Sequence, residues 1–145
     1  MFFHFLETPL SSAAMQNSTK LVLALVNGGA LLDYRNREGL TPMHKAAEKG
    51  NSEAVKTLLD LGASPSPKDE RGLTPLYLAV THNVDPFIVE SLLHDRSTIG
   101  AQDSQGWAEV HQVRWVGNNA IYSQGIWEKH FQFNEIFYFF FALKF

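Results

Sequence analysis

The sequence predicts an all-α solenoid, in which pairs of helices stack side by side and hairpin-like loops join the pairs. A three-residue motif recurs every 33 residues, at Thr8-Pro9-Leu10, Thr41-Pro42-Met43 and Thr74-Pro75-Leu76. A pair of small residues follows each motif at a constant offset, and a glycine stands two residues before the second and third motifs. One helix pair cannot bury its apolar face alone, so units with this period are expected to stack into a continuous core.

The motifs divide the chain into repeats. The 145 residues, 45% hydrophobic and 19% charged, have the composition of one globular domain. We expect about three full repeats, at 7–38, 39–71 and 72–105, and a partial fourth at 106–117. The fourth repeat opens one residue late, because one residue is inserted around Val84-Asp85. Residues 1–6 and the aromatic-rich stretch 118–145 do not follow the pattern.

The first helix of each repeat is expected to start at the threonine–proline pair. In repeat two, Thr41 can act as the N-cap, while Pro42 at the first helical position lacks only an N–H that would have no partner there. The small residues Ala46 and Ala47 allow close packing against neighbouring helices, and Gly50 can end the helix.

The second helix of each repeat is expected to carry a buried apolar stripe. In repeat two it begins near Asn51-Ser52 and ends at Gly62, and its stripe is Val55, Leu58 and Leu59. In repeat three, Asp85 is expected to cap this helix, with Pro86 at its first position. The predicted stripes of the other two repeats are Ile88, Val89, Leu92 and Leu93 in repeat three, and Leu21, Leu23, Leu25 and Val26 in repeat one.

The period and the frame Gly-x-Thr-Pro-Leu-His resemble those of ankyrin repeats, over roughly Glu7 to Gly117. This resemblance implies that the loops project as fingers. It also implies that His44 and His111, at the histidine position of the frame, hydrogen-bond neighbouring loops.

Further stretches resemble the ankyrin region of the Shank family of postsynaptic scaffold proteins. They are Asn27-Gly28-Gly29-Ala30, the run from Lys56 to Pro65, and Asp103 followed by Gly106-Trp107, Glu109 and His111-Gln112. The Shank resemblance implies a cytoplasmic adaptor at the cell cortex or postsynaptic density. It also implies a protein partner of the spectrin type or the Sharpin type.

In an ankyrin stack, a partner meets the finger tips and the outward positions of the first helices, on the concave side. Arginine and tryptophan are enriched at such binding surfaces, and an acidic, partly apolar peptide or helix would suit this mixture of side chains. We therefore expect partner contacts at Arg35, Arg37, Glu38, Leu40, Glu48, Lys49, Lys68, Glu70, Arg71, Leu73, Thr81, His82, Gln102, Ser104, Gln105, Trp107 and Arg114. Trp107 could instead pack against Arg71 within the stack.

Catalysis, cofactors, metals and nucleic acid find no support in the sequence. The net charge is -3, so there is no basic field for nucleic acid, and there are no cysteines for a disulfide or a thiolate metal site. The remaining histidines lie at unrelated repeat positions, without zinc-ligand spacing. No nucleophile elbow, phosphate loop or dinucleotide motif occurs.

The two ends of the chain leave several interpretations open. Residues 1–6 are apolar but lack the basic start of a secretory signal, and residues 136–143 are too few to span a membrane. The tail could belong to a truncated or misread gene product, or anchor the chain at a membrane surface. It could also form a replacement cap, with Ile136, Phe139, Phe140 and Leu143 on one face. A stack with partner-binding repeats alone could also act as a competitive regulator of a scaffold.

Overall fold

The computed structural model describes residues 7–82, 84–95, 97, 98 and 100–106. Its helices form three consecutive pairs, which confirms the predicted all-α fold. The pairs are α1 (Pro9–Met15) with α2 (Thr19–Asn27), α3 (Pro42–Lys49) with α4 (Ser52–Asp60), and α5 (Pro75–Thr81) with α6 (Pro86–His94). The expectations for His111, Trp107, Arg114 and the tail 118–145 lie outside the described residues. The proposed repeat boundaries and the partial fourth repeat stay predictions.

The threonine–proline pairs start the first helices as predicted. Thr8, Thr41 and Thr74 are N-caps in extended conformation, and each accepts a hydrogen bond from the backbone N–H three residues later. The predicted cap of α6 is also present, since the Asp85 side chain accepts from the Phe87 N–H. The expected end of α3 is confirmed at Gly50, whose φ is 73°.

The core runs through all three helix pairs. Ala46 and Ala47 are fully buried, as their small size predicted, and Val55, Leu58 and all four stripe residues of α6 lie in the same core. In α4, Leu59 is only partly buried, at the margin of the core.

The predicted stripe of α2 is wrong in part. Leu21 and Leu23 are both 42% exposed, whereas Val22 between them is fully buried. Leu25 and Val26 pack against the core, as expected. Residues 22, 25 and 26 follow helical spacing and stand 33 residues before Val55, Leu58 and Leu59, whereas residues 21 and 23 point to opposite sides of Val22.

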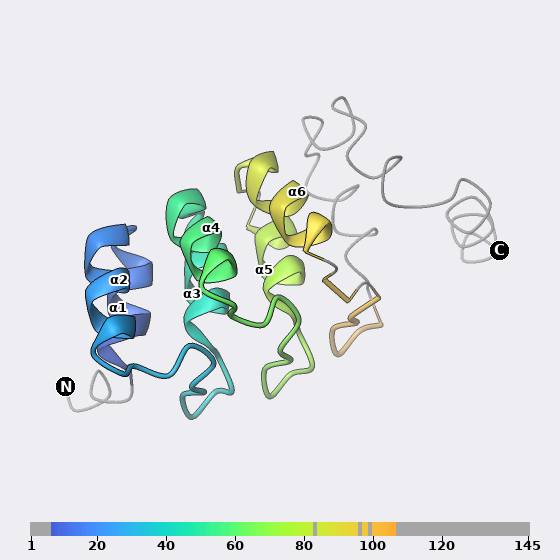
Figure 1. Ribbon diagram of the computed structural model, residues 1–145. Helices are drawn as coiled ribbons and strands as arrows, with labels where there is room; N and C mark the ends of the chain where they lie inside the picture. The colour runs from blue at the N-terminus through green and yellow to red at the C-terminus, as the bar shows by residue number, and fades with distance from the viewer. Residues whose placement is uncertain (1–6, 83, 96, 99, 107–145) are drawn as a thin grey trace, which may run out of the picture.

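The helix pairs lie side by side in chain order (Figure 1). First helices contact first helices, α1 with α3 and α3 with α5, and second helices contact second helices in the same way. The loops between pairs all project from one end of the helices (Figure 1). Among the described residues, no helix is long and apolar enough to cross a membrane.

Candidate protein-binding surface

Each projecting loop is held by one buried or half-buried amide or carboxylate. We call these loops finger one (33–40), finger two (66–73) and finger three (100–106). In finger two, Oδ1 of Asp69 accepts from the backbone N–H groups of Arg71 and Leu73, both at 2.9 Å. In finger one, Asn36 makes the same two bonds with Glu38 and Leu40, also at 2.9 Å. Side chains of this type commonly close such turns on their own backbone.

Finger three repeats the arrangement with Asp103, which accepts from the Gln105 N–H at 2.8 Å. Positions 36, 69 and 103 thus follow the repeat period, with the one-residue insertion in the last step. These three anchoring residues were not predicted as a group from the sequence, although their regular spacing is a signal that could have identified them.

Fingers one and two are joined to each other. The Glu70 N–H donates to the Glu38 carbonyl at 3.0 Å, and the Arg35 guanidinium donates to the Lys68 carbonyl at 2.6 Å. Gly39 makes this approach possible. Its φ is 74°, and a Cβ there would lie 2.9 Å from the Glu70 nitrogen. The two tips therefore form one connected backbone unit.

Side chains of the first helices anchor the fingers. Nε2 of buried His44 lies 3.0 Å from the Leu73 carbonyl in finger two, and Nδ1 accepts from the Thr41 N–H at 3.1 Å. At the equivalent position of repeat three, the Tyr77 hydroxyl donates to Asp103 in finger three at 2.8 Å. The predicted loop contact of His44 is thus confirmed.

The environment of His44 favours its neutral form. Burial lowers the pKa of His44 below its ordinary value of 6.5, although the hydrogen bond to the Leu73 carbonyl opposes this shift. Because Nδ1 accepts a hydrogen bond, the proton of the neutral ring resides on Nε2 and is donated to Leu73. The ring acts as a structural link between helix and finger.

Comparison with known proteins supports the interpretation of the chain as a stack of repeats. A family model described as ankyrin repeats, in three copies, matches residues 10–103. The chain belongs to the ankyrin-repeat family. It is 50% identical over 113 residues to SH3 and multiple ankyrin repeat domains protein 2 from Homo sapiens, covering 77% of this chain. It is 46% identical over 114 residues to SH3 and multiple ankyrin repeat domains protein 1 from Mus musculus, covering 78%.

These relatives are much longer than this chain, which spans 6% of the first and 5% of the second. They belong to the Shank family, so the resemblance to that family drawn from the sequence is confirmed.

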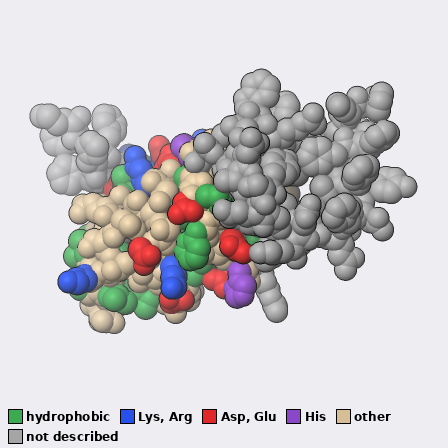
Figure 2. All heavy atoms as spheres, turned by 90° about the horizontal axis from the view of Figure 1, so that it is seen from above, with side chains coloured by type: hydrophobic (Ala, Val, Ile, Leu, Met, Phe, Trp, Pro, Cys, Tyr) green, Lys and Arg blue, Asp and Glu red, His purple; other side chains and the backbone are tan. Residues whose placement is uncertain are grey.

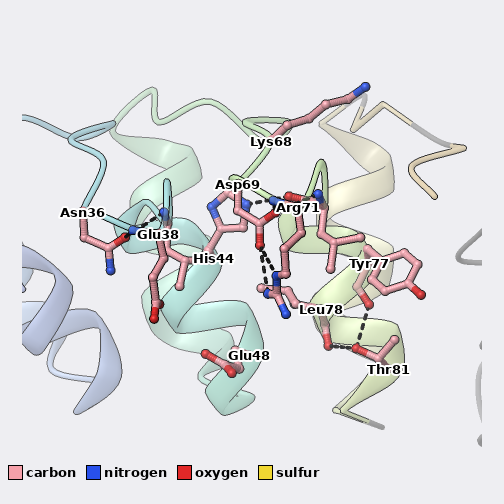
Figure 3. Close-up of polar contacts among 12 residues, drawn as sticks. Asn36, Glu38, His44, Glu48, Lys68, Asp69, Arg71, Tyr77, Leu78 and Thr81 are labelled. Atoms are coloured by element: carbon pink, nitrogen blue, oxygen red, sulfur yellow. Dashed lines mark hydrogen bonds and ion pairs between the residues drawn. The ribbon is translucent and has the colours of Figure 1, made fainter. Parts of the chain in front are cut away.

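Most of the residues predicted to meet a partner are accessible on this ankyrin stack. In finger two, the Lys68 side chain extends away from the stack, while Arg71 folds back onto Asp69 (Figure 3). In finger three the accessible residues are uncharged. The exposed predicted residues are Arg35, Arg37, Glu38, Lys49, Lys68, Glu70, Arg71, His82, Gln102, Ser104 and Gln105.

Leu40 and Leu73 require a correction. Both are only 5% exposed and pack with Tyr77 and Leu78 in a small apolar cluster. The turn closed by Asn36 or Asp69 places the leucine that ends each finger against the first helices. These two residues therefore stabilise the fingers and offer a partner no side chain.

The helix positions of the predicted surface lie on adjacent helices. Glu48 on α3 and His82 after α5 approach to 3.7 Å, and both are partly exposed. The Thr81 hydroxyl donates to the backbone of α5, to Tyr77 and Leu78 at 3.1 Å (Figure 3). The Thr81 hydroxyl therefore already has hydrogen-bond partners in its own helix. Glu48, Lys49 and His82 are partly or fully accessible to a partner.

The face on the other side of the stack also carries charges of both signs. Viewed from above, on the side away from the fingers, acidic and basic side chains are interspersed (Figure 2). Within the described part of the chain, no cluster of three histidine, aspartate or glutamate residues could hold a metal ion.

Proposed function

We propose that this ankyrin stack is a non-catalytic protein-interaction module, and that its partner lies across the finger tips and the adjoining parts of α3 and α5. One observation carries the proposal. The backbone of each of the first two fingers is fixed by a side chain at its base, while the charged side chains at its tip are exposed. Exposed groups on a rigid backbone suit recognition of another protein.

The partner proposed is an acidic, partly apolar peptide or helix. Fingers one and two expose four cations and three carboxylates, and finger three adds uncharged amide and hydroxyl groups. Complementary charge mainly steers association and sets specificity. The seven charged groups are Asp33, Arg35, Arg37, Glu38, Lys68, Glu70 and Arg71.

The resemblance to the Shank family suggests the type of partner and the cellular site. It supports a spectrin-type cytoskeletal protein or a Sharpin-type protein as the partner, and a cytoplasmic site at the cell cortex or postsynaptic density. In this proposal the chain acts as a scaffold fragment that holds one protein.

The proposal is tested by measuring binding of a spectrin-type fragment and a Sharpin-type protein by titration calorimetry. In the test variant, Arg37→Glu and Lys68→Glu reverse two exposed tip charges on different fingers. We expect binding to weaken by about tenfold or more, because arginine and complementary charge contribute strongly at interfaces.

Lys56→Glu is the matched control, since Lys56 is exposed on α4 and belongs to neither the fingers nor the first helices. It should leave binding unchanged. Equal binding by the tip variant and the wild-type chain, or equal weakening by the control, would contradict this placement of the surface.

A further inference from the structure

Serine or threonine precedes five of the six prolines in this chain. Protein kinases of the proline-directed class recognise this dipeptide, so each pair is a candidate phosphorylation site. Three are the threonine–proline pairs that start α1, α3 and α5, where the threonine hydroxyl already caps the helix. The other two are Ser64-Pro65 and Ser66-Pro67, in a stretch between α4 and α5 that forms neither helix nor strand. The choice therefore lies between these two serines.

The surroundings of the two serines differ. The Ser64 N–H donates to the Asp33 carboxylate at 3.0 Å, so a phosphate on Ser64 would lie close to a like charge. Oγ of Ser66 instead accepts from the Thr98 N–H at 2.6 Å, and this bond lies at the exposed surface. The charged residue nearest to Ser66 along the chain is a cation, Lys68. A phosphate on Ser66 would therefore have a hydrogen-bond donor beside it.

Repeat one carries an acidic residue at the position of Ser66. Asp33 stands 33 residues before Ser66. Their partners, Ser64 and Thr98, are also equivalent, because each follows a residue whose N–H donates to the carbonyl five residues earlier, at the end of the second helix. The same bond between neighbouring repeats is thus made once by a carboxylate and once by a hydroxyl. An anionic acceptor therefore fits this position of the repeat.

A kinase must open the chain around Ser66 to bind it, because Ser66 is half-buried and Pro67 is buried. Few bonds resist this opening. Pro65 and Pro67 have no N–H to donate, and the Ser66 N–H reaches Oγ of Ser64 at the long distance of 3.5 Å. Proline also favours an extended conformation in the residue before it, which is the conformation that kinases bind. Local opening of this kind requires much less free energy than unfolding of the whole stack.

We propose that Ser66 is a phosphorylation site for a proline-directed protein kinase, and that its phosphate accepts from the Thr98 N–H as the Asp33 carboxylate accepts from the Ser64 N–H. In the reaction, Oγ of Ser66 forms a bond to the γ-phosphorus of ATP, ADP leaves, and a base of the kinase takes the hydroxyl proton. The charged acceptor makes a stronger hydrogen bond than the hydroxyl. Phosphorylation thus tightens the junction between finger two and the segment after α6, and the inference does not depend on the proposed protein partner.

The site is tested by incubating the full 145-residue chain with ATP and each of two purified kinases, one mitogen-activated and one cyclin-dependent. Mass spectrometry should locate the phosphate on Ser66. Ser66→Ala should abolish its incorporation, whereas Ser64→Ala, the matched control, should be modified like the wild-type chain. No modification by either kinase, or phosphate on Ser64 or a capping threonine to the same extent as on Ser66, overturns the proposal.

Amide hydrogen exchange measured by NMR tests the effect of the phosphate. In the phosphorylated chain, exchange of the Thr98 N–H should be slower by about threefold or more, because its acceptor is charged. Ser66→Asp, which introduces the residue of repeat one, should also slow this exchange relative to Ser66→Ala. The Ala30 N–H, which donates to Leu25 in repeat one, is the internal control and should not change. Unchanged or faster exchange at Thr98 after phosphorylation overturns the role assigned to the phosphate.

Ser66→Thr guards against a loss of folding in Ser66→Ala. Threonine keeps a hydroxyl before Pro67, so this variant should still be phosphorylated at residue 66. Loss of modification in Ser66→Thr as well would mean that the fold around residue 66, and not its hydroxyl, controls the reaction. That outcome would overturn the assignment of Ser66.

Discussion

The Asp69 carboxylate is almost fully enclosed, whereas the Arg71 guanidinium that pairs with it at 2.9 Å is 63% exposed. A pair with one exposed partner contributes little to stability. The two backbone hydrogen bonds to Oδ1 are the larger contribution, and neutral Asn36 makes the same two bonds one repeat earlier. The residue at this position is therefore required for its oxygen atom, and its charge is secondary.

His44 should make the stability of the stack depend on pH. Its pKa is lowered in the folded chain, so the unfolded chain binds the proton more readily. Stability is then complete above about pH 6.5 and falls as the pH drops from there toward the lowered pKa, by at most about 1.4 kcal/mol per pH unit. Urea unfolding of the wild-type chain at several pH values between about 7.5 and 5.5 measures this slope.

The control is His44→Gln, which cannot titrate. We expect it to be less stable at neutral pH, because the link to Leu73 is weakened, and to have a flatter pH dependence. The exposed pair of His82 and Glu48 is present in both proteins, so its contribution cancels. Parallel pH profiles would show that His44 is not the responsible group.

At the scale of the element, a finger depends on close approach to its neighbour. Gly39 and Gly72 occupy equivalent positions, and their φ angles are 74° and 80°. A Cβ at Gly39 would meet the backbone of finger two, whereas a Cβ at Gly72 would meet nothing within 4 Å. The two glycines share a backbone conformation but differ in their surroundings.

Substitution of these glycines by alanine should separate the cost of the left-handed backbone from the cost of disturbing the contact between the fingers. Gly72→Ala should cost about 1–2 kcal/mol for the left-handed backbone alone. Gly39→Ala should cost more, because the hydrogen bond from Glu70 to Glu38 must also lengthen or break. Thermal and urea unfolding of both variants give the comparison, and equal losses would mean that the fingers do not support each other.

The helix starts could be predicted from the sequence, because a threonine–proline pair at a fixed period has few other interpretations. The loop contact of His44 was implied by the resemblance to ankyrin repeats. The stripe of α2 could not be chosen by inspection, since every residue from Leu21 to Val26 is apolar. Alignment with Val55 would have selected Val22. The depth of Leu40 within its finger depends on the turn that Asn36 closes, and a single sequence does not reveal it.

At the scale of the whole molecule, stability is distributed along a line of repeats. Each helix pair packs on its neighbours in the chain, as the contacts α1–α3, α3–α5 and α4–α6 show. In such stacks, stability is approximately a sum of repeat and interface contributions. Asn51 contributes to the first interface, because its amide donates to the carbonyls of Ala14 and Met15 at 2.7 and 2.8 Å.

Asn51→Ala should therefore weaken one end of the stack more than the other. Loss of its hydrogen bonds is expected to cost about 1–3 kcal/mol. Hydrogen exchange should show reduced protection in α1 and α2 and smaller changes in α5 and α6. Asn27→Ala is the control, because Asn27 is exposed at the end of α2. Equal loss of protection throughout would indicate that the stack unfolds only as a single unit.

The hydrogen bond from Glu70 to Glu38 has a thermodynamic consequence for recognition. A loop that is mobile before binding must lose conformational entropy when it becomes fixed, and this loss reduces affinity. Fingers one and two already restrict each other. A partner that contacts both therefore finds them preorganised, and the entropy lost on binding falls mainly on the exposed side chains of the tips.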